Sequence, residues 1–332
     1  MSARSSLLFP PHWRQFAPMT RPQIAASDAV ALNAMLMAVR QGADVVCDRW
    51  SLSLIIAAFL GDTKFAEFER RTGIASRLAT MRLRTLVEQG IMVRLPYSIR
   101  PLRHEYRLTI MGEAFRAVVI QMVRWERNWN GAVMPGDMVA QLCGARLEPV
   151  MRCRACGAVV TARDISLKVS RSDLAQKPVK QALHRRSIIS ESPDGSGLQH
   201  FHESLDVFGD KWGIEILVCA FTGIRRFNDF RTCTDIYANI LSDRLGRLTE
   251  ARLLRNPDGP GEPGYRLTAK GFDAYGVLVA LQDWSDNWLS QRYRSPVKLI
   301  HEKCGQLFHV AGPDAELDAR EPDNPKKSIA RT

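Results

Sequence analysis

The sequence is poor in cysteine and in long apolar runs, and each shortage excludes a class of protein. Seven cysteines in 332 residues are too few, and odd in number, for a disulfide-built scaffold, so a reducing cytoplasm is the expected location. The longest uncharged apolar run, roughly residues 51–61, is well short of the ~18–20 residues of a membrane span. The apolar trio Leu7-Leu8-Phe9 is too short for a signal-peptide core.

Signatures of catalysis are also missing. The sequence contains no phosphate-binding loop, no G-x-S-x-G, no H-E-x-x-H and no dinucleotide fingerprint, so we expect no enzyme. Positive charge, in contrast, is plentiful. Lys and Arg total 46 against 35 Asp and Glu, which gives a formal net charge of +11 and indicates an anionic partner.

The excess charge lies in the first half of the chain. Residues 28–168 hold 20 Lys and Arg against 13 Asp and Glu, whereas residues 199–311 hold 14 of each. Within the first half, the segment 70–107 contains nine arginines and only two acidic residues. Such a run is either a solvated face or a surface that binds a polyanion, and the pattern around it favours the second interpretation.

The chain contains an internal repeat. Residues 44–95 align without gaps onto 206–257 with 15 identities, among them Trp50 with Trp212. Three residues are then lost from the second copy, and the match resumes at Tyr106-Arg-Leu-Thr on Tyr265-Arg-Leu-Thr. We therefore predict two copies of one domain. The expected organisation is an N-terminal extension (1–27), a first domain (28–142), a Cys-rich extension (143–168), a linker (169–198), a second domain (199–299), and a degenerate extension with a disordered tail (300–332).

Each copy shows the same order of predicted elements, which is helix, helix, turn, helix, two-stranded ribbon, helix. In copy one the helices are 50–60, 65–68, 75–89 and 111–130, and the strands 91–95 and 104–109 are joined by a loose 96–101 turn. In copy two the corresponding segments are 212–222, 227–230, 237–251 and 269–290, with strands 253–256 and 264–268. This order predicts an α+β, mainly α fold with two tandem winged helix-turn-helix domains, each with a two- or three-stranded wing. A helix fits the DNA major groove and a ribbon lies along the backbone, which suits duplex DNA.

Several strings make the resemblance specific. They are Asp-Arg-Trp50 (Asp-Lys-Trp212), Gly-x-x-x-Phe-x-x-Phe, Ile-x7-Arg-Leu-x-x-Leu, and Tyr-Arg-Leu-Thr-x-x-Gly, with Asn239-Ile-Leu-Ser-Asp-Arg-Leu245 an especially close match. In combination they resemble the HxlR-type family of bacterial winged-helix regulators, over roughly 43–130 and 205–290. The resemblance implies a transcriptional regulator that binds short inverted repeats, usually as a homodimer. Because this chain carries both copies covalently, it resembles a fused dimer, and further dimerisation stays open.

In copy one, helical periodicity assigns the DNA-facing side chains of the predicted third helix. Ala79, Leu83 and Leu86 face inward, which turns the neighbouring positions outward. Arg77 and Arg84 suit guanine edges, and Met81 is either a thymine-methyl contact or a surface methionine. Lys64 precedes the second helix, and the wing arginines are expected to clamp phosphates. The candidate DNA-binding residues of copy one are Lys64, Arg77, Thr80, Met81, Arg84, Arg100 and Arg103.

Copy two offers a less basic set. Asn239 suits adenine, whereas Asp243 either accepts from a cytosine amine or pairs with Arg247 and reads nothing. The candidates here are Arg225, Arg226, Asn239, Ser242, Asp243 and Arg247. Arg82 and Arg244 lie at the edge of the buried face, as structural ion pairs or as phosphate contacts. Since the two third helices differ, we predict double-stranded DNA with two unlike half-sites as the partner.

The cysteines give a candidate metal site. Cys143, Cys153 and Cys156 include one C-x-x-C-Gly knuckle, which is typical of zinc sites, but three thiols are one ligand short. The alternatives are a degenerated knuckle held by packing, a labile thiol pair, or a cross-copy site that adds His301 or Cys304. Zinc is therefore a possible cofactor and not a settled one.

Other features leave alternatives open. Cys47, beside a helix start, is either a redox sensor or a half-buried cysteine, and Cys219 is expected in the core. The Trp125/Trp129 and Trp284/Trp288 pairs predict a dimer-like seam between the copies, with a small-molecule pocket as the alternative. The competing functions are a redox- or metal-responsive regulator on this scaffold, and a protein-interaction module whose second copy has lost DNA binding.

Overall fold

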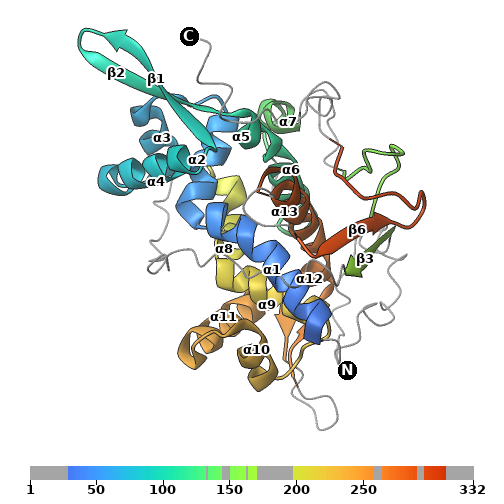
Figure 1. Ribbon diagram of the computed structural model, residues 1–332. Helices are drawn as coiled ribbons and strands as arrows, with labels where there is room; N and C mark the ends of the chain where they lie inside the picture. Colours follow the sequence, from blue (N-terminus) through green and yellow to red (C-terminus); the bar gives the residue numbers. More distant parts are fainter. Residues whose placement is uncertain are drawn as a thin grey trace, which may run out of the picture.

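The chain folds into a mainly helical body with short antiparallel strand pairs (Figure 1). The computed structural model describes residues 29–131, 134–143, 150–161, 164–169, 197–256, 264–289 and 295–311. The predicted N-terminal extension, most of the linker and the tail lie outside these residues. Among the described helices, none is both long and apolar enough to cross a membrane.

Copy one begins with a long helix and ends with a short one. Its elements are α1 (Ala29–Val46), α2 (Arg49–Phe59), α3 (Phe65–Thr72), α4 (Ser76–Glu88), β1 (Met92–Ile99), β2 (Leu102–Leu108), α5 (Ile110–Ala114), α6 (Arg116–Trp129) and α7 (Gly136–Cys143). The ribbon β1–β2 projects from the body beside α3 and α4 as the wing (Figure 1).

Copy two repeats this order, and only the base of its ribbon lies within the described residues. Its elements are η4 (Gln199–Phe201), α8 (His202–Phe208), α9 (Lys211–Phe221), α10 (Phe227–Thr234), α11 (Ala238–Glu250), β4 (Leu254–Arg255), β5 (Arg266–Leu267), α12 (Ala269–Asp273) and α13 (Tyr275–Trp288). Outside the repeat, β3 (Ile165–Val169) pairs antiparallel with β6 (Val297–His301). The bounds of α2, α3 and α4 match those of α9, α10 and α11 at the spacing of 162, and both winged helix-turn-helix domains are present as predicted.

The repeated sequence motifs set the same local geometry twice. Asp48 and Asp210 cap α2 and α9 by accepting backbone N–H groups at the first turn. Thr109 and Thr268 do the same for α5 and α12. The glycine of the Thr-x-x-Gly motif is required for space, because a Cβ on Gly112 would lie 2.2 Å from the Ile91 carbonyl oxygen, with an equivalent clash in copy two.

Three expectations about element bounds were wrong. The predicted terminal helices 111–130 and 269–290 are each split in two, at Phe115 and at Ala274. The predicted 96–101 turn of the wing is mostly strand, since β1 continues to Ile99 and the register shifts only between Pro96 and Ser98. The sequence patterns also did not reveal α1, whose 18 residues pack mainly against copy two through α9 and α13.

The two copies meet about a pseudo-twofold axis. Asp48 and its repeat mate Asp210 form a β-bridge with each other, which places the axis between them. On α6, Trp125 donates its indole N–H to the carbonyl of Lys270 at 3.2 Å. On α13, Trp284 donates to the carbonyl of Met111, the mate of Lys270, at 2.9 Å. This reciprocal exchange is what a two-fold dimer interface requires, and it confirms the predicted tryptophan seam.

Ion pairs repeat the same reciprocity. Arg49 of copy one pairs with Asp206 of copy two, and the mate residues Lys211 and Asp44 pair in the opposite sense at 3.1 Å. One contiguous cluster of buried apolar side chains runs through both copies. The copies therefore fold as one body, so the relative position of α4 and α11 is fixed by shared packing and not by a linker.

Candidate nucleic-acid interface

Helix α4 presents the basic residues of copy one on a surface opposite its buried stripe. Ala79, Leu83 and Leu86 are buried, as the helical period predicted. The predicted contact residues Arg77, Thr80, Met81 and Arg84 are all exposed. Arg84 makes an ion pair with Glu88 at 2.7 Å, and both side chains are more than half exposed. Because an exposed ion pair contributes little free energy, Arg84 can exchange this partner for a phosphate or a base at little cost. Arg77 has no ion-pair partner among the described residues.

Helix α11 has the same buried stripe, formed by Leu241, Leu245 and Leu248, but a different exposed face. Its predicted contact residues are also exposed (Asn239, Ser242, Asp243 and Arg247). The Asp243 carboxylate pairs with Arg247 at 3.0 Å and also with Arg244. This geometry matches the alternative in which Asp243 engages neighbouring arginines, and it reduces the positive charge of this face.

The same set of contacts in both copies holds the wing against the second helix of the motif, α3 or α10. The backbone N–H of Tyr106 donates to Thr63 at 2.7 Å, and in copy two Tyr265 donates to Arg225 at 2.8 Å. The tyrosine rings meet the second Phe of the Gly-x-x-x-Phe-x-x-Phe motif edge-on, at 6.4 Å from Phe68 and 6.2 Å from Phe230. The motif residues therefore fix the wing in a set orientation to α3 and α10.

Cations stand at the start of these second helices. Lys64, Arg225 and Arg226 are exposed, as the phosphate-contact prediction needs. In copy one, however, Glu67 already accepts from the backbone N–H groups of Thr63 and Lys64, both at 2.9 Å. These two hydrogen bonds lower the pKa of the Glu67 carboxyl below its usual range. The N–H groups of Thr63 and Lys64 are therefore already occupied, and the exposed lysine side chain is the cation available to a phosphate here.

The wing of copy one carries its two predicted phosphate contacts at the far end. Arg103 lies on β2, Arg100 lies in the turn, and both side chains are exposed with no ion-pair partner among the described residues. Apolar side chains accompany them, with Ile99 83% and Leu102 63% exposed. In copy two only the base of the ribbon, β4 and β5, falls within the described residues, so Asp258 and Glu262, set against the wing arginines in the sequence, lie outside them.

Arg82 and Arg244 are resolved as structural side chains. Arg82 pairs with the helix cap Asp48 at 3.3 Å, and Arg244 pairs with Asp210 at 2.5 Å. Both guanidinium groups are largely buried, with side-chain exposures of 16% and 13%. The two ion pairs are equivalent in the two copies. In each copy the motif arginine links the recognition helix (α4 or α11) to the start of α2 or α9, and it is not presented to a ligand.

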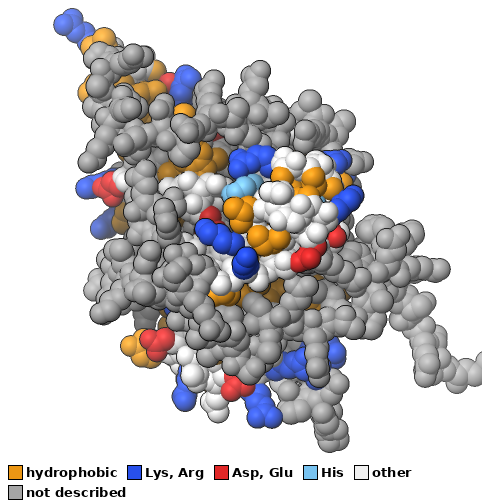
Figure 2. All heavy atoms as spheres, turned by 45° about the vertical axis from the view of Figure 1, so that its right-hand side comes forward, with side chains coloured by type: hydrophobic (Ala, Val, Ile, Leu, Met, Phe, Trp, Pro, Cys, Tyr) orange, Lys and Arg blue, Asp and Glu red, His pale blue; other side chains and the backbone are white. Residues whose placement is uncertain are grey.

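The two recognition helices lie toward the same side of the molecule. In Figure 1, α4 with the wing is above and α11 with α10 is below, beside the central helices. Figure 2 looks onto the part of the molecule that carries β3 and β6, where Lys and Arg side chains are scattered among apolar and uncharged ones. The basic candidates of copy one lie on α4, on the wing and, in the case of Lys64, at the start of α3.

Cys47 and Cys219 are both buried in the core. Burial raises the pKa of the Cys47 thiol well above its ordinary value, and the negative charge of the neighbouring Asp48 raises it further. A buried, protonated thiol is a poor nucleophile, so the redox interpretation of Cys47 is not supported. Cys219 is buried on α9, as expected, and burial also raises the pKa of its thiol.

The predicted metal trio is only partly brought together. Cys153 and Cys156 lie in one group with His301 and Cys304, and all four ligand atoms are within 4.8 Å of one another. Cys143 is not in this group; it is buried on α7 within the main core, where burial raises the pKa of its thiol. Sequence spacing pointed to Cys143 because it is nearest along the chain, whereas the fold supplies the missing ligands from copy two.

Known proteins resemble each copy. A protein-family model described as HxlR-like helix-turn-helix matches residues 45–134 and 207–293, just over half of the chain. An uncharacterized HTH-type transcriptional regulator of Mycobacterium bovis is 34% identical over 130 residues, which are 39% of this chain and 82% of that relative. The uncharacterized HTH-type transcriptional regulator YybR of Bacillus subtilis is 35% identical over 83 residues, which are 25% of this chain and 66% of YybR. A solved structure of a candidate transcription factor from Pseudomonas aeruginosa shares 32% identity, covers 38% of this chain and 86% of its own, and has a TM-score of 0.29.

Proposed function

The chain belongs to the HxlR-like helix-turn-helix family, and from this premise we propose that it regulates transcription by binding one duplex DNA site through α4 and α11 together. The reciprocal interface between the copies carries this proposal. Two groove-reading helices related by a two-fold axis suit an operator with two half-sites. Here both helices are held in one polypeptide, so a single chain is the binding unit.

The chemistry of the exposed side chains assigns roles to each half. On α4, Arg77 and Arg84 are long donors suited to guanine, and the exposed Met81 suits a thymine methyl. On α11, Asn239 is suited to adenine, while the Asp243–Arg247 pair leaves little net charge. The two half-sites are therefore unlike in sequence, and the operator is an imperfect inverted repeat.

Contacts to phosphate supply most of the affinity and come mainly from copy one. Lys64 and the wing arginines Arg100 and Arg103 are exposed cations beside α4. Copy two contributes Arg225 and Arg226 at the start of α10. Each neutralised phosphate steepens the salt dependence of binding by about 0.9 in log–log slope, so these contacts can be counted by experiment.

A salt titration tests this assignment. The affinity of the full chain for the duplex upstream of its own gene is measured by mobility shift at several salt concentrations. Arg100→Ala combined with Arg103→Ala is expected to weaken binding and to reduce the slope by about one to two. Arg127→Ala, an exposed arginine on α6, is the control and should leave the slope unchanged. An unaltered slope in the wing double variant would contradict the wing contacts.

A second function, a protein-interaction module, is favoured only for copy two, by its paired Asp243 and lower positive charge. In that case copy two would add no DNA contacts. Ala substitutions of Arg225 and Arg226 distinguish the two, because they reduce the salt slope only if copy two touches phosphate.

A further inference from the structure

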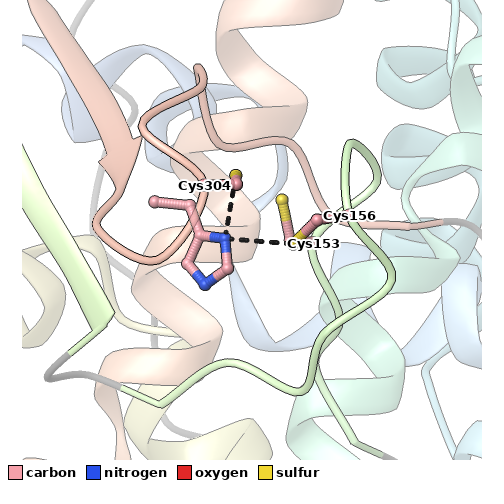
Figure 3. Close-up of side chains that lie close together, drawn as sticks. Cys153, Cys156 and Cys304 are labelled. Atoms are coloured by element: carbon pink, nitrogen blue, oxygen red, sulfur yellow. Dashed lines mark hydrogen bonds between the residues drawn. The ribbon is translucent and has the colours of Figure 1, made fainter.

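A cluster of metal-binding side chains joins the two copies away from the recognition helices. The four-ligand cluster consists of Cys153, Cys156, His301 and Cys304. Figure 3 shows Cys153 and Cys156 on one loop facing Cys304 on another. His301 Nδ1 lies 3.2 Å from the sulfur of Cys304 and 3.4 Å from that of Cys156. The first two ligands follow copy one and the other two follow copy two.

The two loops that carry the ligands have the same backbone form. Cys153-Arg-Ala-Cys156-Gly157 and His301-Glu-Lys-Cys304-Gly305 both place two ligands three residues apart before a glycine. In each loop the glycine N–H donates to the carbonyl of the first ligand at 2.8 Å. Gly157 and Gly305 have φ of 70° and 67°, a left-handed conformation that favours glycine. Two matching turns thus present their ligand pairs to a common centre.

The size and chemistry of the cluster fit a tetrahedral zinc ion. Zinc–sulfur bonds of about 2.3 Å and zinc–nitrogen bonds of about 2.0–2.1 Å place neighbouring ligand atoms roughly 3.4–3.8 Å apart. The four ligand atoms here lie within 4.8 Å, so a small contraction brings them to that geometry. Three thiols and one imidazole form a common set for structural zinc, and none of the three cysteines is in a disulfide.

The surroundings leave the cluster without another explanation. Cys153 is 0% and His301 1% exposed. Among the described residues, the hydrogen-bond partners of the His301 ring are the thiols of Cys156 and Cys304, both at Nδ1, and its Nε2 has no partner. Weak hydrogen bonds to thiols compensate little for the burial of the imidazole in a metal-free fold. A metal ion would instead bind the lone pair of the unprotonated ring nitrogen.

The cluster is attached to the elements that hold the copies together. β3 from copy one's side and β6 from copy two's side pair along five residues that end at His301. The strand pair rests on α1, where Ala34, Ala38 and Val297 form a buried apolar group. On the α13 side, Asp283 accepts from the backbone N–H of Val310 at 2.9 Å and lies 2.7 Å from His309. An ion here would cross-link the extension of copy one to the end of copy two.

We propose that the four-ligand cluster binds one Zn²⁺ ion per chain, and that this ion clasps the two copies outside the DNA-reading surface. The proposal does not depend on DNA binding. It is tested directly by metal content, and structurally by how well β3, β6 and the two ligand loops are protected from hydrogen exchange.

Metal analysis of the full chain, purified under reducing conditions, tests the site. The expected result is about one zinc per chain, and at least a tenfold loss of zinc in Cys156→Ser and in Cys304→Ser. Cys233→Ser is the matched control, because Cys233 is a half-buried cysteine on α10 outside the cluster, and it should keep full zinc. His301→Ala should lose the metal and His301→Cys should keep it, since four thiolates also bind zinc tetrahedrally.

Cobalt substitution covers the case in which purified protein has lost its metal. Equimolar Co²⁺ added to the reduced chain should give the absorption bands of tetrahedral thiolate coordination, and Cys304→Ser should abolish them. Removal of the metal should raise hydrogen exchange in β3 and β6 while α2–α4 stay protected. Full zinc in the ligand variants, or a reduced chain that binds neither Zn²⁺ nor Co²⁺, would overturn the proposal.

Discussion

The recognition helices α4 and α11 begin and end at matching positions, yet their exposed faces carry different charges. The exposed positions Arg77 and Met81 of α4 correspond to Asn239 and Asp243 of α11. The buried stripes stay apolar in both helices, because Leu83 on α4 and Leu245 on α11 occupy equivalent places in the packing against α2 and α9. The residues that pack the two helices against the body are therefore alike, while their exposed residues differ.

The largest expected effect separates the two faces directly. Arg77→Ala with Arg84→Ala removes two donors, each worth about 1–3 kcal/mol at a guanine, and should weaken DNA binding by about 100-fold or more. Asn239→Ala with Arg247→Ala should cost about tenfold, because Arg247 is already paired. Shift assays at one salt concentration measure both. Equal losses of DNA affinity in the two double variants would contradict the proposed difference between the α4 and α11 faces.

The next effect concerns what the copies share. Trp125→Phe and Trp284→Phe each keep a buried aromatic ring but delete one indole hydrogen bond across the seam. Each should lower the free energy of unfolding by about 1 kcal/mol, and the two losses should be similar. Denaturant unfolding of the two variants gives the values. A large loss in one and none in the other would contradict a reciprocal interface.

A smaller effect sharpens the comparison by making copy two more basic. Asp243→Asn removes the carboxylate that pairs with Arg244 and Arg247, which frees Arg247 for DNA. Binding should tighten by about two- to fivefold, and the salt slope should grow by about one unit if Arg247 reaches a phosphate. Weaker binding would instead show that Asp243 itself contacts a base.

The smallest expected effect tests a difference between α13 and its counterpart α6. Burial raises the pKa of the Asp286 carboxyl to about 7, with Asp283 raising it and Lys298, Ser295 and Gln282 opposing that shift. Copy one has Arg127 at this place. Because the unfolded chain loses the proton near pH 4 and the folded chain near pH 7, this group makes stability fall as pH rises between these values.

Asp286→Asn should therefore gain stability over the natural chain as pH rises. The expected rise in Tm is about 1–3 °C at pH 8, with no difference at about pH 4. Thermal unfolding across this range checks it. A variant that is less stable at pH 8 would show that the ionised carboxylate has a partner that stabilises it.

The sequence allowed the repeated core to be predicted because both copies constrain it. Two tryptophans in register, and a shared Asp that caps α2 and α9, locate the same helix twice. The break at Phe115 was not visible, because its immediate neighbours Ala114 and Arg116 are both good helix formers. Helix α1 was missed since the described part of its counterpart region in copy two holds only the short η4 and α8.

The metal cluster shows the same limit more clearly. Cys156 and His301 are 145 positions apart and come from different copies. The second loop also replaces the first Cys of the knuckle with His, so a search within one copy finds only half the ligands. In contrast, the exposure of the predicted contact residues on α4 and α11 followed from helical period, because the buried leucines dictate which side of each helix faces out.

The most direct test of the account is a hydroxyl-radical footprint of the full chain on the duplex upstream of its own gene, combined with the protein-to-DNA ratio in the complex. The account predicts that one chain per duplex protects two neighbouring segments of unlike sequence. In the Arg77→Ala, Arg84→Ala double variant, one of the two segments should lose its protection before the other. A single protected segment, or two chains on two identical segments, would contradict the account.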